Sequence, residues 1–346
     1  MTSCKLFVEV RILRKVLAGI ALLALMVSAA AAQDLIGAGS TFAYPIYSKW
    51  FAEYSAAHPG VEINYQSIGS GGGIRQVELG LVDFGASDMP MTDAMLAASK
   101  VKLMHIPTVL GAVVPIYNVP GIANLRFSGP ALAGIFLGKI TNWSDPRIAQ
   151  DNPGVRLPNL KITVVHRSDG SGDTFIFADY LSKISKTWKD GPGAGTSLSW
   201  PVGVGGKGNE GVAGLVLQLP GSIGYVTLIY ALQSDIDYGA VRNAAGNWVK
   251  ASLASVTAAA ASIKNMPPDF RVSITNAPGA DAYPISSFTY LLIPTHPTNM
   301  AKERVLRDLL SWIVKSGEKQ ASGLSYAPLP ENLVPKVLAK IYSLPD

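Results

Sequence analysis

The stretch His166-Arg167-Ser168-Asp169-Gly170-Ser171-Gly172-Asp173-Thr174-Phe175 places an arginine, carboxylates and hydroxyls on one short turn. Before it, residues 161–165 are β-branched or apolar with polar neighbours, which predicts a strand. After it, residues 174–183 carry apolar side chains at helical spacing, and Ser171 is placed to be the N-cap. A strand, a glycine-bearing turn and a helix start leave backbone N–H groups at the positive end of a helix dipole. This geometry binds oxyanions.

Residues 1–32 have the pattern of an export signal: a positive n-region, an apolar h-region from Val16 to Val27, and the small-residue cleavage site Ala30-Ala31-Ala32. A membrane anchor is the alternative, but the apolar segment is short for a span. The only cysteine, Cys4, lies upstream of the h-region and not at the cleavage point, where a lipid-anchored cysteine would stand. We expect an exported protein that is soluble outside the cytoplasm, is not lipid-anchored and has no disulfide.

The charge of the chain is concentrated in this signal. Four basic residues against Glu9 give the signal a net charge of +3, so the mature chain keeps +2 of the total of +5. No basic run with interleaved aromatic residues is present either. The sequence therefore favours no nucleic-acid partner.

Two other segments repeat the strand, glycine-rich turn and helix. The first is a strand over 35–39, the turn Ser40-Thr41-Phe42 and a helix over 43–57. Because Phe42 stands where the third glycine of a dinucleotide fingerprint belongs, a Rossmann site is not favoured. The second is a strand over 61–65, a glycine-rich turn containing Ser70 and a helix over 74–81, where the glycines allow a close backbone approach or form a plain flexible loop.

Asp88 follows a short apolar strand, at the point where a strand meets a turn. It is either a functional carboxylate or a turn residue before the helix predicted over 93–99.

Two long apolar runs, over 109–117 and 286–294, are predicted to be extended segments that connect two parts of the chain. The simplest interpretation is an α/β protein with two lobes, each a mixed sheet flanked by helices, and two crossing segments. We expect lobe I to comprise residues 33–112 and 286–346, and lobe II residues 113–285.

Several kinds of chemistry are not supported. The four histidines have no metal-ligand spacing. The Asp169-x-Ser171-x-Asp173 pattern resembles the start of a calcium loop, but Thr174 replaces its glycine. Gly205-Gly206-Lys207-Gly208 lacks the hydroxyl residue that follows the lysine of a P-loop, and neither Ser70 nor Ser171 lies in a nucleophile elbow. We therefore expect no metal, no cofactor and no enzymatic activity.

Six motifs together resemble the phosphate-binding subunit of the Pst ABC transporter over the whole mature chain. In chain order they are Gly37-Ala-Gly-Ser-Thr-Phe42, Ile68-Gly-Ser-Gly-Gly-Gly73, Val82-Asp-Phe-Gly-Ala-Ser-Asp88, Arg167-Ser-Asp-Gly-Ser-Gly172, Gly205-Gly-Lys-Gly-Asn209 and Gly221-Ser-Ile-Gly-Tyr225. The resemblance implies the periplasmic-binding-protein fold of type II, and an exported monomer that binds inorganic phosphate between its lobes and delivers it to an ABC-type permease.

The resemblance also implies the residues that contact the anion: Ser40, Thr41, Phe42, Ser70, Asp88, Arg167, Ser171 and Gly172. Asp173 belongs to the same set but departs from the enteric members, in which a threonine follows the Ser-Gly pair. A carboxylate only accepts hydrogen bonds, so Asp173 bears on the protonation state of the ligand.

A physical mechanism accompanies this resemblance. Phosphate near neutral pH carries a proton that an ionised Asp88 can accept, whereas sulfate carries none and would leave that carboxylate unpaired. The site would then select phosphate by rejecting sulfate. Arg167 offers a planar fork of donors, and Asp169 either orients that fork or forms the turn before Gly170.

Three other functions can be tested against this prediction. An exported phosphatase would turn over a chromogenic phosphate ester, and a surface adhesin of the same fold would bind no ligand. A binder of another tetrahedral oxyanion would not distinguish phosphate from sulfate.

Overall fold

The computed structural model describes residues 33–345, so the signal peptide predicted over 1–32 lies outside the described residues. The first part of the described chain alternates strand and helix: β1 (Gln33–Gly39), α2 (Tyr44–Ala57), β2 (Val61–Ser67), α3 (Ser70–Glu78), β3 (Phe84–Ser87), α4 (Asp93–Ala98) and β4 (Leu103–Tyr117). The middle part comprises β5 (Arg126–Phe127), α5 (Gly129–Phe136), α6 (Pro146–Asp151), β6 (Thr163–Arg167), α7 (Gly172–Ile184), α8 (Lys186–Asp190), β7 (Val204–Gly206), α9 (Gly208–Gln218), β8 (Ser222–Thr227) and α10 (Leu228–Gln233). The last part comprises β9 (Ala240–Arg242), β10 (Trp248–Val249), α11 (Leu253–Ala261), β11 (Ser286–Pro294), α12 (Met300–Lys315), the 3₁₀ helix η1 (Gly317–Leu324) and α13 (Val334–Ile341).

The strands form a mixed sheet with the order β2-β1-β3-β11-β4-β8-β6-β7, and β10, β9 and β5 form a small second sheet. Strands β1, β2 and β3 are parallel, as are β6, β7 and β8, whereas β4 and β11 run antiparallel to their neighbours. The mixed α/β architecture predicted from the sequence is confirmed. Hydrogen bonds join the strands of the large sheet without interruption from β2 to β7.

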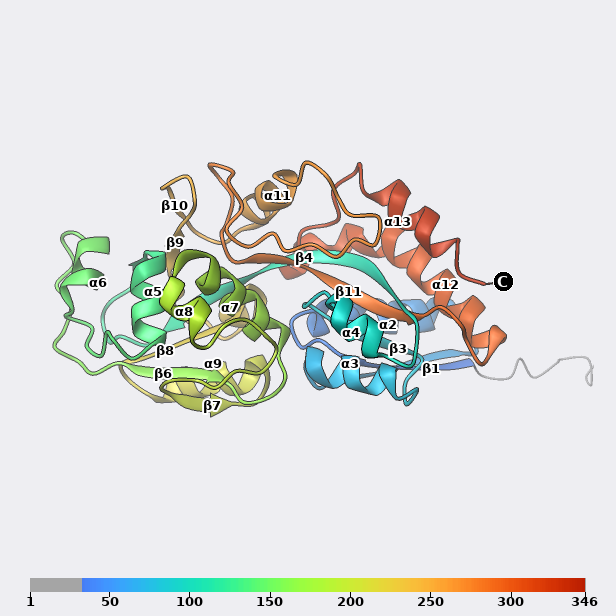
Figure 1. Cartoon of the computed structure of the whole chain (residues 1–346), viewed down its shortest axis with the longest axis horizontal. Coiled ribbons are helices and arrows are strands. Elements are labelled where there is room, and N and C mark those ends of the chain that lie inside the picture. Colours follow the sequence, from blue (N-terminus) through green and yellow to red (C-terminus); the bar gives the residue numbers. More distant parts are fainter. Residues whose placement is uncertain (1–32, 346) are drawn as a thin grey trace, which may run out of the picture.

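Strands β4 and β11 connect the two ends of the sheet. In β4, Leu103 to Ala112 pair with β11, and Val113 to Tyr117 pair with β8. Figure 1 shows both strands running between α2 and α3 on one side and α5, α7 and α9 on the other. Strand β11 has the predicted bounds, but β4 begins at Leu103 rather than Val109, because its polar residues His105 and Thr108 are buried within the sheet and interrupt the apolar run.

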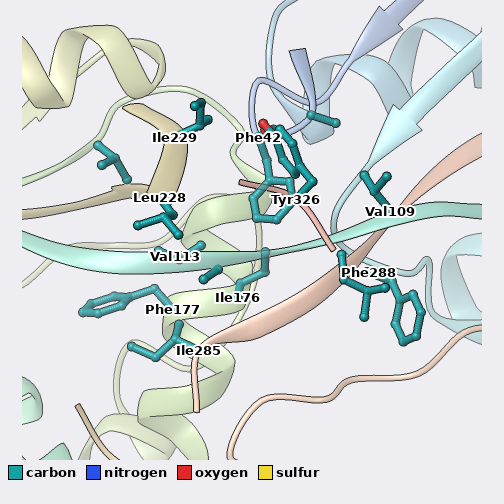
Figure 2. Close-up of a cluster of buried hydrophobic side chains, with 14 of the residues drawn as sticks. Phe42, Val109, Val113, Ile176, Phe177, Leu228, Ile229, Ile285, Phe288 and Tyr326 are labelled. Atoms are coloured by element: carbon teal, nitrogen blue, oxygen red, sulfur yellow. The ribbon is translucent and has the colours of Figure 1, made fainter. Parts of the chain in front are cut away.

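The hydrophobic core is continuous across these strands. The cluster in Figure 2 gathers side chains of β4 and β11 with Phe42, Tyr326 and side chains of α7 and α10. The rings of Phe42 and Tyr326 pack edge to face, with their centres 6.0 Å apart. The cluster packs the turn at residues 40–42 against the crossing strands and so fixes its position.

Helix α3 begins at Ser70, inside the glycine run, and not at Ile74 as predicted. A Cβ on Gly73 would lie 2.5 Å from the Cα of Gly39 and 2.7 Å from the carbonyl oxygen of Ala86. Only glycine lets the helix start so close to the ends of β1 and β3, so residues that are poor helix formers nevertheless open this helix. The helix ends before Gly80, whose φ of 66° is left-handed.

Within residues 33–345, no helix combines the length and the apolar character needed to cross a bilayer.

Candidate functional site

Polar residues at the ends of several strands meet in the middle of the molecule. The turn after β1, the start of α3 and the residue after β3 come from one side, and the end of β6 and the start of α7 come from the other. The structure brings together every predicted site residue, and all of them are buried: Ser40, Thr41, Phe42, Ser70, Asp88, Arg167, Ser171, Gly172 and Asp173.

Asp88 is held by three hydroxyl groups. Its Oδ1 accepts hydrogen bonds from Ser40 Oγ at 2.6 Å and from Thr289 Oγ1 at 2.5 Å, and its Oδ2 accepts one from Ser70 Oγ at 3.0 Å. A carboxylate has about four acceptor positions, two on each oxygen. One position therefore remains, on Oδ2.

The environment of Asp88 is unfavourable to its charge. Burial raises the pKa of this carboxyl to about 7, the nearby Asp173 carboxylate acts in the same direction, and the hydroxyls of Ser40, Thr289 and Ser70 oppose the rise. The side chain is fully shielded from solvent. A proton is thus exchanged at this group near neutral pH.

Arg167 is oriented by two carboxylates. Its Nε donates to Asp169 Oδ1 at 2.8 Å, its Nη2 donates to Asp169 Oδ2 at 2.5 Å, and its Nη1 donates to Asp173 Oδ2 at 2.8 Å. Asp169 also accepts from the backbone N–H of Gly208 at 3.0 Å. The sequence left open whether Asp169 orients the guanidinium or forms a turn, and the structure shows that it orients the guanidinium.

Asp173 has protein partners on both oxygens. Oδ2 accepts from Arg167 and from Asn209 Nδ2 at 3.0 Å, and Oδ1 accepts from Thr227 Oγ1 at 2.6 Å. These bonds fill most of its acceptor positions. Its carboxylate is therefore used mainly as a counter-ion of Arg167.

The starts of helices supply further donors. Ser171 is the N-cap of α7, as predicted, and its Oγ accepts from the backbone N–H of Thr174 at 3.2 Å. Ser40 Oγ accepts from the N–H of Ala43 ahead of α2. The ring of Phe42 lies in the core, so only its backbone can face the site. The first N–H groups of a helix have no intrahelical acceptor, so those that no other protein group binds are free to bind an anion.

The two sides of the site touch each other. Gly71 N donates to Gly170 O at 2.9 Å, Asn209 Nδ2 donates to Thr41 Oγ1 at 3.1 Å, and Tyr230 donates to Thr41 O at 2.8 Å. A Cβ on Gly172 would lie 2.1 Å from Asp88 Oδ2. The structure is closed around the site, and glycine is required where the sides meet.

Four residues of this network were not singled out from the sequence: Thr289, Asn209, Thr227 and Tyr230. Each acts through a partner far along the chain; Thr289, for example, bonds to Asp88 across 201 positions. A sequence signal did exist for Thr289, because polar residues inside a strand that is otherwise apolar need buried partners. Asn209 lay in a motif of the resemblance without an assigned role.

No group of three or more His, Cys, Asp or Glu side chains that could hold a metal ion occurs among residues 33–345. The arrangement offers many N–H and O–H donors, one guanidinium and one carboxyl that exchanges a proton near pH 7. It is suited to a small, partly protonated oxyanion.

Comparison with known proteins gives consistent results. A family model described as a PBP superfamily domain matches residues 27–317. The "Phosphate-binding protein PstS" of Xylella fastidiosa (strain Temecula1) is 50% identical over 306 residues, covering 88% of this chain and 83% of that protein. The protein of the same name from Pasteurella multocida is 44% identical over 312 residues, covering 89% and 90%.

Solved structures share the fold. A high-affinity periplasmic phosphate-binding protein with bound phosphate has a TM-score of 0.74 at 23% identity, covering 88% of this chain and 93% of that one. A phosphate-binding protein from Stenotrophomonas maltophilia has a TM-score of 0.65 at 20% identity, covering 89% and 94%. At these identities the likeness establishes the architecture.

Proposed function

The chain belongs to the PstS family of phosphate-binding proteins, and from this premise we propose that it captures inorganic phosphate between two lobes and delivers it to an ABC-type phosphate permease. The resemblance stated from the motifs is confirmed by these relatives. The family consists of binding proteins and not of enzymes. The chain acts as an exported, periplasmic monomer that is not lipid-anchored.

We assign two lobes, one on each side of the crossing strands. Lobe I comprises residues 33–112 and 286–346, and lobe II comprises residues 113–285. The boundary near residue 112 is supported by β4, in which Ala112 pairs with β11 and Val113 pairs with β8. The phosphate lies between the lobes, where Thr41 of the first meets Asn209 of the second.

The residues around the phosphate divide between the lobes. Lobe I supplies Ser40, Thr41, Phe42, Ser70 and Asp88, and lobe II supplies Arg167, Ser171, Gly172 and Asp173. Arg167 has five N–H donors, of which three are used by carboxylates, so two remain for phosphate oxygens. Backbone N–H groups at the helix starts and the hydroxyl of Thr41, which only accepts from Asn209, supply the other donors.

The observation that carries the proposal is the single remaining acceptor position on Asp88 Oδ2. Phosphate brings a proton to that position, so one hydrogen bond forms between two oxygens. Sulfate brings none, and an ionised Asp88 would face it unpaired and repelled. Sites that read a hydrogen in this way discriminate by roughly 10⁴ to 10⁵.

Isothermal titration calorimetry on the mature chain tests the proposal. We expect tight binding of phosphate at pH 8 and weak binding of sulfate under the same conditions. Equal affinity for the two anions would show that the site binds tetrahedral oxyanions without reading a proton. Turnover of a chromogenic phosphate ester by the same preparation would contradict the binding role.

A further inference from the structure

Residues 269–275, here called the strap, connect the two lobes in addition to β4 and β11. The strap belongs to the long segment between α11 and β11, which in Figure 1 runs across the molecule in orange, in front of the crossing strands. The ring of Phe270 and the side chain of Ile274 are buried, which holds the strap against the core. Its polar side chains reach in two directions.

One end of the strap holds lobe I. Arg271 Nη1 donates to the carbonyl oxygen of Met91 at 2.7 Å, and Arg271 Nη2 donates to Asp93 Oδ1 at 2.6 Å. Asp269 orients the same guanidinium from within the strap, at 2.8 Å from Nε. Met91 lies in the loop that follows Asp88, here called the Asp88 loop, and Asp93 is the first residue of α4, directly after that loop.

The other end holds lobe II. Ser273 Oγ and Thr275 Oγ1 both donate to Asp179 Oδ2, and Lys183 Nζ donates to the same two hydroxyls at 2.8 and 2.7 Å. Asp179 and Lys183 lie on α7, the helix whose first residues, Gly172 and Asp173, face the site. The strap therefore joins the two elements that close on the ligand.

The strap is too short to keep both attachments if these elements separate. Arg271 and Ser273 are two positions apart, and an extended chain spans only about 3.6 Å for each residue. An opening of the lobes that moves the Asp88 loop away from α7 by more than the slack of the side chains must break one end. The lobe I end is the weaker one, since Asp93 is 92% exposed.

We propose that the strap is a latch that forms when the lobes close, and that Arg271 and Asp179 thereby slow the release of the ligand without touching it. The inference rests on the proposed capture of phosphate between the lobes. It assigns Arg271 a positioning role: the residue stabilises the closed form and takes no part in reading the anion.

Stopped-flow measurement of phosphate binding and release on the mature chain tests the latch. Arg271→Ala should speed dissociation by about tenfold, as expected for the loss of a charged hydrogen bond together with an exposed ion pair, and should change association little. The ratio of phosphate to sulfate affinity should stay unchanged, because Asp88 keeps its partners.

Arg147→Ala is the matched control. Arg147 also forks onto a carboxylate, that of Asp145, and donates to a backbone carbonyl, that of Lys139, but all of these lie within lobe II. Its dissociation rate should equal that of the wild type. Asp93→Asn keeps an acceptor oxygen but removes the negative charge of the exposed partner, and it cannot disturb the core. It should therefore speed dissociation by a smaller factor even where Arg271→Ala folds poorly.

The dependence of dissociation on ionic strength distinguishes a latch held by charges from a loss of packing. Raising the ionic strength should speed dissociation from the wild type and leave Arg271→Ala unchanged. Wild-type dissociation rates in both Asp93→Asn and folded Arg271→Ala would overturn the latch, and so would a loss confined to association. If the wild type binds phosphate and both variants release it at the wild-type rate, the latch is refuted and the proposed function stands. If the wild type binds no phosphate, the latch and the proposed function are both refuted.

Discussion

The affinity of the wild type for sulfate should rise as the pH falls through about 7, the pKa to which burial raises Asp88. Above this pH the ionised carboxyl repels sulfate. Below it the carboxyl is protonated and can donate a hydrogen bond to a sulfate oxygen from Oδ2, the oxygen with a free position. Sulfate itself does not titrate in this range, so the change reports on the protein.

The size of the effect follows from the protonated fraction of Asp88. With a pKa of about 7, about one tenth of the molecules carry the proton at pH 8 and about nine tenths carry it at pH 6. Because apparent affinity scales with the fraction of the competent form, sulfate should bind about tenfold more tightly at pH 6 than at pH 8. Below pH 6 the affinity should level off.

Asp88→Asn removes the titration and supplies a permanent amide donor. Its sulfate affinity should exceed that of the wild type at pH 8 and should be the same at pH 6 and pH 8. Competition of sulfate against labelled phosphate at constant ionic strength measures both proteins. Asp190→Asn, a change at an exposed carboxylate on α8, is the control and should behave as the wild type. A flat sulfate affinity in the wild type, or a pH dependence that persists in Asp88→Asn, would refute proton reading.

Three further changes test other parts of the account. Gly172→Ala should weaken phosphate binding by at least about a hundredfold in a folded protein, since its Cβ would lie 2.1 Å from Asp88 Oδ2; Gly214→Ala, where a Cβ meets open space, is the control for calorimetry. Asp173→Thr should lower the pH at which sulfate binding rises, because the Asp173 carboxylate helps to raise the pKa of Asp88. If the midpoint of the pH dependence in the competition assay does not move, the Asp173 carboxylate does not influence the pKa of Asp88. Burial raises the pKa of Glu318 to about 8, above its ordinary value, so the stability it contributes is full at acidic pH and is lost as the pH rises through 8. Glu318→Gln should therefore lose less thermal stability than the wild type between pH 6 and pH 9, and parallel melting curves would contradict this.

Local signals predicted the elements that carry the site. The N-cap at Ser171 and the bounds of β11 match the structure, because a cap and an apolar run each depend on neighbours within a few positions. The start of α3 was missed because glycine is a poor helix former in isolation. There the approach of Gly73 to the backbone of β1 and β3 outweighs propensity.

The partners of the predicted residues could not be read from local patterns. Asp173 was expected to bear on the ligand through its carboxylate, but Asn209 and Thr227, 36 and 54 positions away, bind that carboxylate. The sequence gives the hydrogen-bonding capacity of each side chain, and the fold decides which group uses it. The sequence of the turn is compatible with an Asp169 that orients the guanidinium and with one that only forms the turn. The position of Arg167 at the end of β6 decides between these two roles.

The charges around the site explain why an anion is held without a positive pocket. Arg167 contributes one positive charge against the two carboxylates of Asp169 and Asp173, so these three sum to minus one, and an ionised Asp88 makes the sum minus two. Formal charge therefore opposes every anion. Attraction must come from the hydroxyl of Thr41, the helix starts and the two free donors of Arg167, which bind strongly because they are shielded from water. The surplus carboxylates should disfavour least an anion that brings its own proton, so we expect the negative charge of the site itself to favour phosphate over sulfate.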